Sequence, residues 1–133
     1  MMIFAGKRPD TLGVRDGRLA TCPHTPNCVC SQDSDPGHKI DPLTYTSNPA
    51  EAMAALKKVI QEMPKAQIIE EKNNYIYAEF TSALMGFVDD VEFYLDEAAK
   101  VIHVRSASRL GKSDLGVNRK RVEAIRAKLK EQA

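Results

Sequence analysis

The chain has 133 residues, of which 43% are hydrophobic and 28% are charged. This is the balance of a single globular domain rather than of a disordered or fibrous chain. No Trp is present, and four Tyr and four Phe are too few for a large aromatic binding platform. The stretch Met1–Pro9 lacks the apolar core of a signal peptide, and no window approaches the roughly 20 apolar residues of a membrane span. We therefore expect a cytoplasmic protein without a membrane span.

The first 48 residues are rich in Pro, Gly, Asp, Ser and Thr and show no sustained helical or strand period. Within them, Pro23 and Pro26 each bias the preceding residue towards extended backbone. A structureless loop of this length is uncommon inside a compact domain. We therefore predict an extended N-terminal arm, residues 1–48, packed on a domain formed by residues 49–133.

The first predicted helix begins at Pro49. Asn48 is a good N-cap, proline suits the first helical position, and Glu51 occupies the acidic position of a capping box. Apolar residues then follow helical spacing along one face, at Ala52, Leu56, Val59, Ile60 and Met63. Pro64 ends the pattern, because proline cannot continue a helix.

Four strands are predicted next. The first is a short run around Ile68 and Ile69 that ends at the turn Lys72–Asn74, and the others cover residues 75–81, 87–95 and 101–106. In the third strand, alternation places Asp89 on the apolar face, with Phe87, Val91, Phe93 and Leu95. The short connections favour an antiparallel meander.

A final helix is predicted from about Asn118 to Glu131, with Val122, Ile125 and Leu129 as its buried stripe. The order is therefore helix, four strands, helix. This order predicts an α+β fold of two layers, in which both helices cover one face of a four-stranded antiparallel meander.

The formal net charge of +1 hides an uneven distribution. Residues 1–48 have a net charge of 0, residues 49–99 of −6 and residues 100–133 of +7. The simpler interpretation is that acidic strands pair with basic residues of the last strand and helix. The alternative is a basic patch for an anionic partner. Nucleic acid is not expected as that partner, because no zinc-finger, helix-turn-helix or RNA-recognition motif is present and the pI is only about 7.7.

The densest polar segment covers residues 105–119, which leave a strand, pass two glycines and enter the last helix. A helix N-terminus favours anions through its unpaired N–H groups and its dipole. Charge is added by Arg105, Arg109, Lys112, Arg119 and Arg121, and arginine can hold a carboxylate or phosphate with two hydrogen bonds. The glycine spacing does not match a phosphate-binding P-loop.

Asp89 is unusual because a buried carboxylate is costly unless it is paired. The expected partner is Arg105 or Arg109. Three interpretations stay open: a solvated aspartate at the ragged start of the strand, a structural pair that holds the loop, or a pair that also binds a ligand or takes part in catalysis.

An enzymatic role would need a base beside a serine nucleophile. The nearest base in the sequence to Ser106 and Ser108 is His103, which shares a strand face with Val101 and Arg105. A histidine there is more commonly solvent-facing, and serines beside a turn more often bond to the backbone.

Three cysteines lie close together, at Cys22, Cys28 and Cys30. An odd number is atypical of a disulfide framework, so we expect thiols. A disulfide between Cys22 and Cys28 stays an alternative. A zinc site that also uses His24 and His38 is a weaker one, because the two ligand pairs of a usual structural site are missing.

Three motifs resemble one family: the runs at 22–32 (CPHTPNCVCSQ), 86–93 (GFVDDVEF) and 105–122 (RSASRLGKSDLGVNRKRV). They are similar to an uncharacterised bacterial and plastid family, domain of unknown function 1499, over roughly Leu19–Leu129. The opening of the chain resembles the cyanobacterial or plastid branch. Cys30 stands where the family usually has serine, which leaves Cys22 and Cys28 as the pair of interest. The resemblance implies no activity, but it points to Cys22, Asn27 and Cys28 in the arm and to polar positions of the second and third motifs.

The leading hypothesis is that the domain binds a small anionic molecule or an acidic protein segment at the basic loop and helix start. Its candidate ligand-binding residues are Asp89, Asp90, Arg105, Ser106, Ser108, Arg109, Asp114, Asn118 and Arg119. One alternative is a hydrolase or transferase that uses Ser, Asp and Arg of the same segment, and another is a thiol or metal role of the arm. No cofactor or metal ion is expected in the leading hypothesis.

Overall fold

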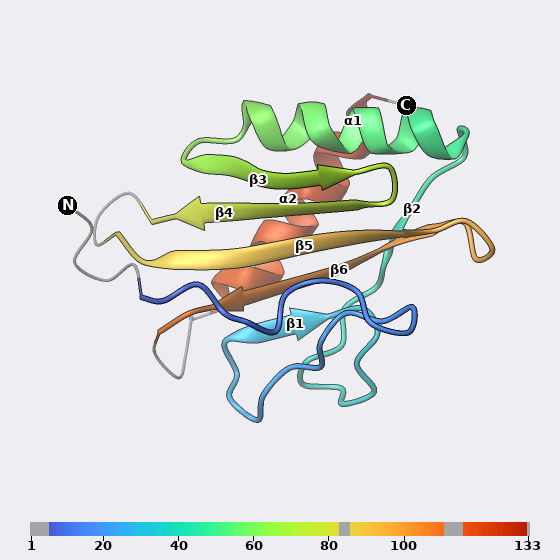
Figure 1. The fold of residues 1–133 in the computed structure, drawn as a ribbon. Coiled ribbons are helices and arrows are strands. Elements are labelled where there is room, and N and C mark those ends of the chain that lie inside the picture. The colour runs from blue at the N-terminus through green and yellow to red at the C-terminus, as the bar shows by residue number, and fades with distance from the viewer. Residues whose placement is uncertain (1–5, 83–85, 111–115, 133) are drawn as a thin grey trace.

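A six-stranded antiparallel sheet forms the centre of the structure, a computed structural model that describes residues 6–82, 86–110 and 116–132 (Figure 1). The strands lie in the order β1-β6-β5-β4-β3, and β2 also pairs with β6. In chain order the elements are β1 (Cys28–Cys30), β2 (Leu43–Thr44), α1 (Pro49–Glu62), β3 (Ala66–Lys72), β4 (Tyr75–Thr81), β5 (Val88–Asp96), β6 (Val101–Ser108) and α2 (Val117–Glu131).

The predicted helices and the four predicted strands are confirmed as α1, α2 and β3–β6. The Asn48 side chain accepts a hydrogen bond from the backbone N–H of Glu51, as the capping pattern indicates, and Met63 caps the other end of α1. The α2 helix begins after Gly116, whose φ of 79° is a left-handed conformation that glycine adopts easily. Both helices contribute to one apolar core with the sheet residues of that face, among them Val91, Phe93 and Val104.

The prediction of a four-stranded sheet was wrong in its number of strands. The arm adds β1 and β2, and both pair with β6, so the element order begins with two strands. These strands have three and two residues, which is too short for a period-2 pattern to be visible in the sequence. They are strands because the edge of β6 offers backbone groups to pair with.

The opposite face of the sheet lies under the N-terminal arm. Leu12, Val14 and Leu19 of the arm pack with Tyr75 and Tyr77 of β4. The arm is thus a second cover, opposite the two helices. It lets the sheet carry buried side chains on both faces, and this arrangement determines how the charged residues are placed.

Candidate functional site

Strand alternation divides the predicted site residues between the two faces of the sheet. Asp89, Ser106 and Ser108 lie on the helix side. There, Asp89 contacts Arg121 of α2, and both serines contact Asn118 of α2. Asp90 and Arg109 lie on the arm side with Tyr77. One end of the sheet therefore holds two separate polar networks rather than one continuous pocket.

The network on the helix side centres on Asn118, which is fully buried. Its Oδ1 accepts hydrogen bonds from Ser106 Oγ at 2.6 Å and from Arg121 Nη1 at 2.8 Å. Its Nδ2 donates to Ser108 Oγ at 2.9 Å and to the carbonyl oxygen of Asn27 at 3.1 Å. The side-chain amide of Asn118 thus connects α2 with β6 and with the residue that precedes β1, and it holds these parts of the fold together.

The partner of Asp89 is Arg121, not Arg105 or Arg109 as predicted. Asp89 Oδ2 lies 2.7 Å from Arg121 Nη2, and the guanidinium lies 5.0 Å from the centre of the Phe80 ring. The prediction failed for Arg105 because that residue faces the arm side, opposite Glu92 in register. Arg121 is one helical turn after Asn118 and shares its helix face, but this i, i+3 spacing does not by itself identify the partner of Asp89.

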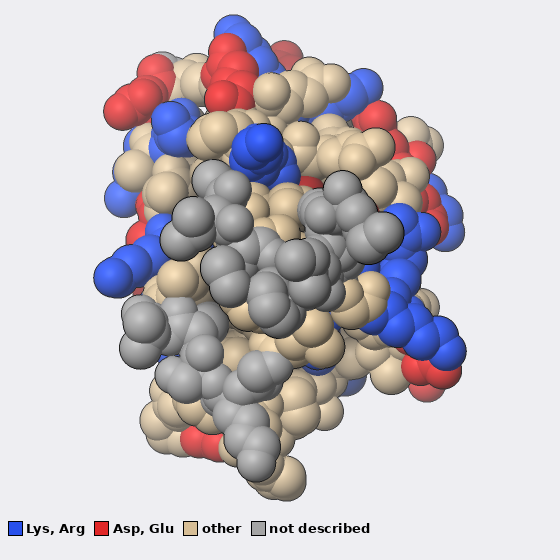
Figure 2. All heavy atoms as spheres, turned by 90° about the vertical axis from the view of Figure 1, so that its left-hand side faces the viewer, with Lys and Arg blue, Asp and Glu red and all other residues tan. Residues whose placement is uncertain are grey.

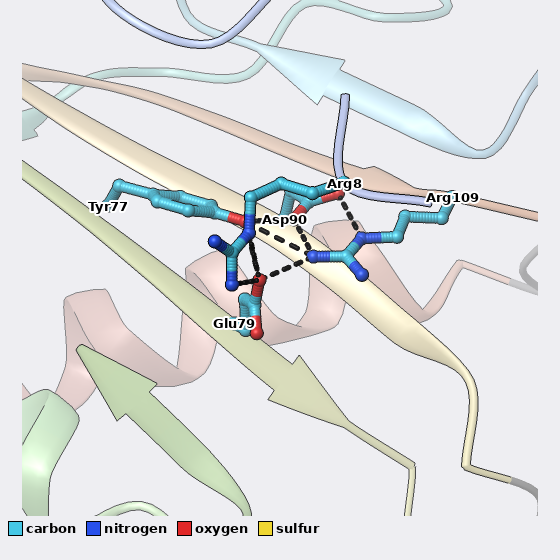
Figure 3. A network of polar contacts seen from close by, with 5 residues as sticks. All are labelled: Arg8, Tyr77, Glu79, Asp90 and Arg109. Atoms are coloured by element: carbon cyan, nitrogen blue, oxygen red, sulfur yellow. Dashed lines mark hydrogen bonds and ion pairs between the residues drawn. The ribbon is translucent and has the colours of Figure 1, made fainter. Parts of the chain in front are cut away.

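The network on the arm side centres on Arg109 (Figure 3). Its Nε and Nη2 donate to the two carboxylate oxygens of Asp90 at 2.9 and 2.8 Å, and Nη2 also donates to Glu79 Oε2 at 2.5 Å. Tyr77 donates to Asp90 at 2.5 Å, and Arg8 of the arm donates to Glu79 at 2.8 Å. Asp90 and Arg109 are among the residues predicted from the sequence, whereas the other three, which come from β4 and from the arm, are not.

The electrostatics of this network favour the charged pairs. The hydrogen bond to Asp90 raises the pKa of Arg109, so its guanidinium stays charged. Burial raises the pKa of Tyr77, as do its hydrogen bonds to Asp90 and Glu79, so the phenol stays protonated. Burial alone would raise the pKa of Glu79, but the hydrogen bonds from Tyr77, Arg8 and Arg109 outweigh it and the pKa is lowered.

A second buried acid, Glu92, lies further along the arm-side face and is 1% exposed. Its Oε2 accepts hydrogen bonds from Tyr75 at 2.5 Å and from the backbone N–H of Gly13 at 2.7 Å. Its Oε1 and Nε of Arg105 have no hydrogen-bond partner in the part of the chain that the structure describes. Arg105 donates to the carbonyl oxygen of Thr21 at 3.4 Å. Burial raises the pKa of Glu92, which favours its neutral form.

The serines of the candidate site have no adjacent histidine base. Ser106 Oγ donates a hydrogen bond to Asn118 on the helix side. His103 lies on the arm side, where its Nδ1 is 3.1 Å from Ser31 Oγ. Burial lowers the pKa of His103. The sheet therefore separates His103 from Ser106 and Ser108, and neither of these two serines forms a nucleophile–base pair with it.

The expectation of three thiols was wrong for two of the cysteines. Cys22 and Cys28 form a disulfide within the arm, which ties the segment before β1 to the first residue of β1, and Cys30 is a buried free thiol. Burial raises the pKa of Cys30, which disfavours its reactive thiolate. Among residues 6–82, 86–110 and 116–132, no cluster of three His, Cys, Asp or Glu side chains could hold a metal ion.

The two remaining candidates differ in how far they can be placed. Arg119 is exposed, and its guanidinium donates to the carbonyl oxygens of Lys39 at 3.0 Å and Gly37 at 3.4 Å. Asp114 lies outside the described residues. The structure therefore brings together Asp89, Ser106, Ser108 and Asn118 on one side and Asp90 and Arg109 on the other, with Arg105 beside Glu92 and Arg119 apart from both groups.

A family model described as "Protein of unknown function (DUF1499)" matches residues 18–129. The chain belongs to the DUF1499 family. The match covers all three motifs that carried the resemblance, but it does not distinguish branches, so the cyanobacterial or plastid branch stays a prediction. No curated protein matches the chain. None of the helices in the described part of this DUF1499 chain has the length and apolarity needed to cross a membrane.

Proposed function

We propose that this DUF1499 domain binds an acidic segment of a partner protein at a cationic surface beside the start of α2. The surface consists of Lys39, Arg119 and Lys120, all of them exposed. It overlaps the basic loop and helix start that the sequence analysis selected. The candidates Asp89, Asp90, Arg105, Ser106, Ser108, Arg109 and Asn118 would then support this end of the domain from within.

The proposal rests on which cations remain after internal pairing. Arg109 is paired with Asp90 and Glu79, Arg121 with Asp89, and Arg126 with Glu123. Two of these arginines, Arg109 and Arg121, join the basic end of the sequence to acids of its acidic middle.

The three cations of the surface have no carboxylate partner among the described residues. Within residues 6–82, 86–110 and 116–132, Arg119 donates to carbonyl oxygens and to no carboxylate. The adjoining segment holds three acids: Asp33 is buried, Asp41 is exposed, and Asp35 lies 3.7 Å from His38 Nε2 and accepts a hydrogen bond from the N–H of Gly37. Figure 2 shows Lys and Arg side chains, with Asp and Glu among them, on both flanks of the end of the molecule where β4 and β6 finish.

The exposure of these side chains favours a protein segment over a small molecule. A small ligand is usually held in a concave site that buries most of its surface. An acidic segment can instead follow separated surface cations, and complementary charge mainly increases the association rate and the specificity. Such binding weakens as salt screens the charges.

Fluorescence anisotropy with a labelled oligo-glutamate peptide tests the proposal. The full chain should bind the peptide at low salt and release it as the salt concentration rises. The double charge reversal Arg119→Glu with Lys120→Glu should abolish binding. Its matched control is Lys58→Glu with Lys100→Glu, which changes the net charge equally at exposed positions elsewhere and should retain most of the affinity.

Two outcomes would overturn the proposal. One is the absence of peptide binding by the wild-type chain at low salt. The other is an equal loss of affinity in the two double variants, which would show a response to net charge alone. Competition by inorganic phosphate at an ionic strength matched with sodium chloride would reassign the surface to a small anion.

A further inference from the structure

A groove of about 480 Å³ lies at the opposite end of α2 from the cationic surface. It is bounded by β2 and the residues that follow it, by the first turns of α1 and by the last turns of α2, which Figure 1 shows converging. Arg119 and Lys130 are separated by about 16 Å along the helix, at 1.5 Å per residue. The groove is therefore a separate feature from the cationic surface and from the two buried networks.

The floor of the groove is apolar. It includes Leu43 of β2, Ile102 of β6 and Ala52 of α1, all of them buried, together with the half-buried Ala55 and Leu129. The two alanines matter because larger side chains at these positions would project into the space. A volume of this size, with an apolar floor and a few polar groups around it, is typical of small-molecule sites.

The charged groups of the lining are two cations, Arg126 and Lys130, and one acid, Glu51. Arg126 is already held by the carbonyl oxygens of Asp41 and Pro42 and by Glu123, so its guanidinium is occupied. Lys130 is exposed and has no ion-pair partner among the described residues. It is thus the cation of this lining that remains available.

Tyr45, the residue after β2, adds a further hydrogen-bond donor to the lining of the groove. Its hydroxyl is buried and has no hydrogen-bond partner in the described part of the chain. A buried hydroxyl without a hydrogen-bond partner is unfavourable. A ligand acceptor that reaches this hydroxyl, once the exposed side chains around it rearrange, would therefore be favoured. Glu51, the acid of the lining, lies on the α1 wall, so an anion is better placed at the α2 wall.

We propose that the groove is a binding site for a small amphipathic carboxylate. The apolar body of the ligand lies over Leu43, Ala52, Ala55 and Leu129. Its carboxylate lies at the α2 wall, with Lys130 as the counter-charge. Burial of the apolar body supplies most of the binding free energy, and Lys130 selects the anionic head group.

Titration of the full chain with decanoate, decan-1-ol and acetate, followed by ¹H–¹⁵N NMR, tests the site. Decanoate should bind saturably below its micelle concentration and shift amide signals of β2 and of the facing ends of α1 and α2. Acetate should not bind, because it has no apolar body. Decan-1-ol should bind more weakly than decanoate by about two- to fivefold, the range expected for one exposed ion pair.

Three single variants separate the contributions. Lys130→Gln should weaken decanoate binding by about two- to fivefold and leave decan-1-ol unchanged. Glu51→Gln should leave decanoate binding unchanged or strengthen it, since it removes an opposing charge. Ala55→Phe should reduce the binding of both ligands by at least about tenfold by filling the groove. Unchanged circular dichroism spectra would show that Ala55→Phe folds normally.

The absence of saturable decanoate binding would overturn the proposal. So would shifts confined to other elements, or equal decanoate affinities of the wild type and Ala55→Phe. Equal affinities for decan-1-ol and decanoate would overturn the assignment of a carboxylate. The groove and the proposed partner surface lie at opposite ends of α2. Arg119→Glu with Lys120→Glu should therefore not change decanoate binding, and Ala55→Phe should not change oligo-glutamate binding.

Discussion

Replacement of Arg109 by alanine is the most direct test of the arm-side network. The substitution removes the bidentate contact with Asp90 and the contact with Glu79. Asp90 is 2% exposed, so it would keep a buried negative charge with Tyr77 as its remaining strong donor. The loss of both charge-assisted hydrogen bonds to a carboxylate this deeply buried determines the size of the effect.

The expected cost is about 3–5 kcal/mol, the usual loss when one member of a buried ion pair is removed. This is a large part of the roughly 5–15 kcal/mol that stabilises a typical domain. With a urea dependence of about 2 kcal/mol per molar, the unfolding midpoint should fall by about 1.5–2.5 M. Far-UV circular dichroism is a suitable signal, because the chain has no Trp.

Two further variants provide controls. Arg8→Ala removes the other arginine bound to Glu79, but the Arg8 side chain is 53% exposed, so its midpoint should change far less. Asp90→Asn in the Arg109→Ala background should recover part of the loss, because it removes the uncompensated charge. The reasoning would be refuted if Arg109→Ala moved the midpoint no more than Arg8→Ala, or if the second substitution destabilised the chain further.

Three other predictions concern the helix-side network, the cysteines and pH. Asn118→Ala should lower the free energy of unfolding by about 2–3 kcal/mol, measured by urea denaturation, because Ser106 and Ser108 of β6 and the carbonyl oxygen of Asn27 lose their hydrogen-bond partner. Thiol titration in denaturant should find one free thiol, that of Cys30, before reduction and three after it; three thiols before reduction would contradict the disulfide. Reduction should lower the free energy of unfolding by about 2 kcal/mol, because the loop that the disulfide closes is short. Burial raises the pKa of Glu92, so the folded state holds its neutral form more readily than the unfolded state does. The contribution of Glu92 to stability is therefore fully present below its unfolded pKa of about 4.5 and is lost as the pH rises through the folded pKa. Glu92→Gln should therefore gain stability relative to the wild type between acid and neutral pH, and a gap that stayed constant with pH would contradict the shift.

The elements that could be predicted from the sequence are those with long patterns. The α1 helix has a cap, a proline at its start and a regular apolar stripe, and β4 and β5 alternate over seven and nine residues. The β1 and β2 strands could not be predicted, because they depend on the exposed edge of β6 rather than on a pattern of their own. Periodicity indicates which face of the sheet a residue occupies, and for Asp89 this prediction is confirmed.

The pairing of the charged residues could not be predicted in the same way. Alternation identifies the face of Asp89 but not which side chain of another layer reaches it, and proximity in sequence favoured Arg105 and Arg109 over Arg121. The same limit explains why Arg8 and Glu79 were missed, since Arg8 is 71 residues away from its partner. Contacts between layers depend on how helix and arm pack on the sheet, and the strand pattern carries no information about that.

Asp89 and Asp90 explain why charge is concentrated at this end of the sheet. They are neighbours on β5, yet one binds Arg121 of α2 and the other binds Arg109, which contacts Glu79 and through it Arg8 of the arm. Because successive strand residues point to opposite faces, a pair of adjacent aspartates can hold a cover on each side of one sheet. A buried charge is stabilised only by a correctly placed partner, so these pairs favour a single position of helix and arm. The arginines that serve this purpose are not available to a ligand, and the remaining exposed cations beside α2 are therefore the ones on which a partner would act.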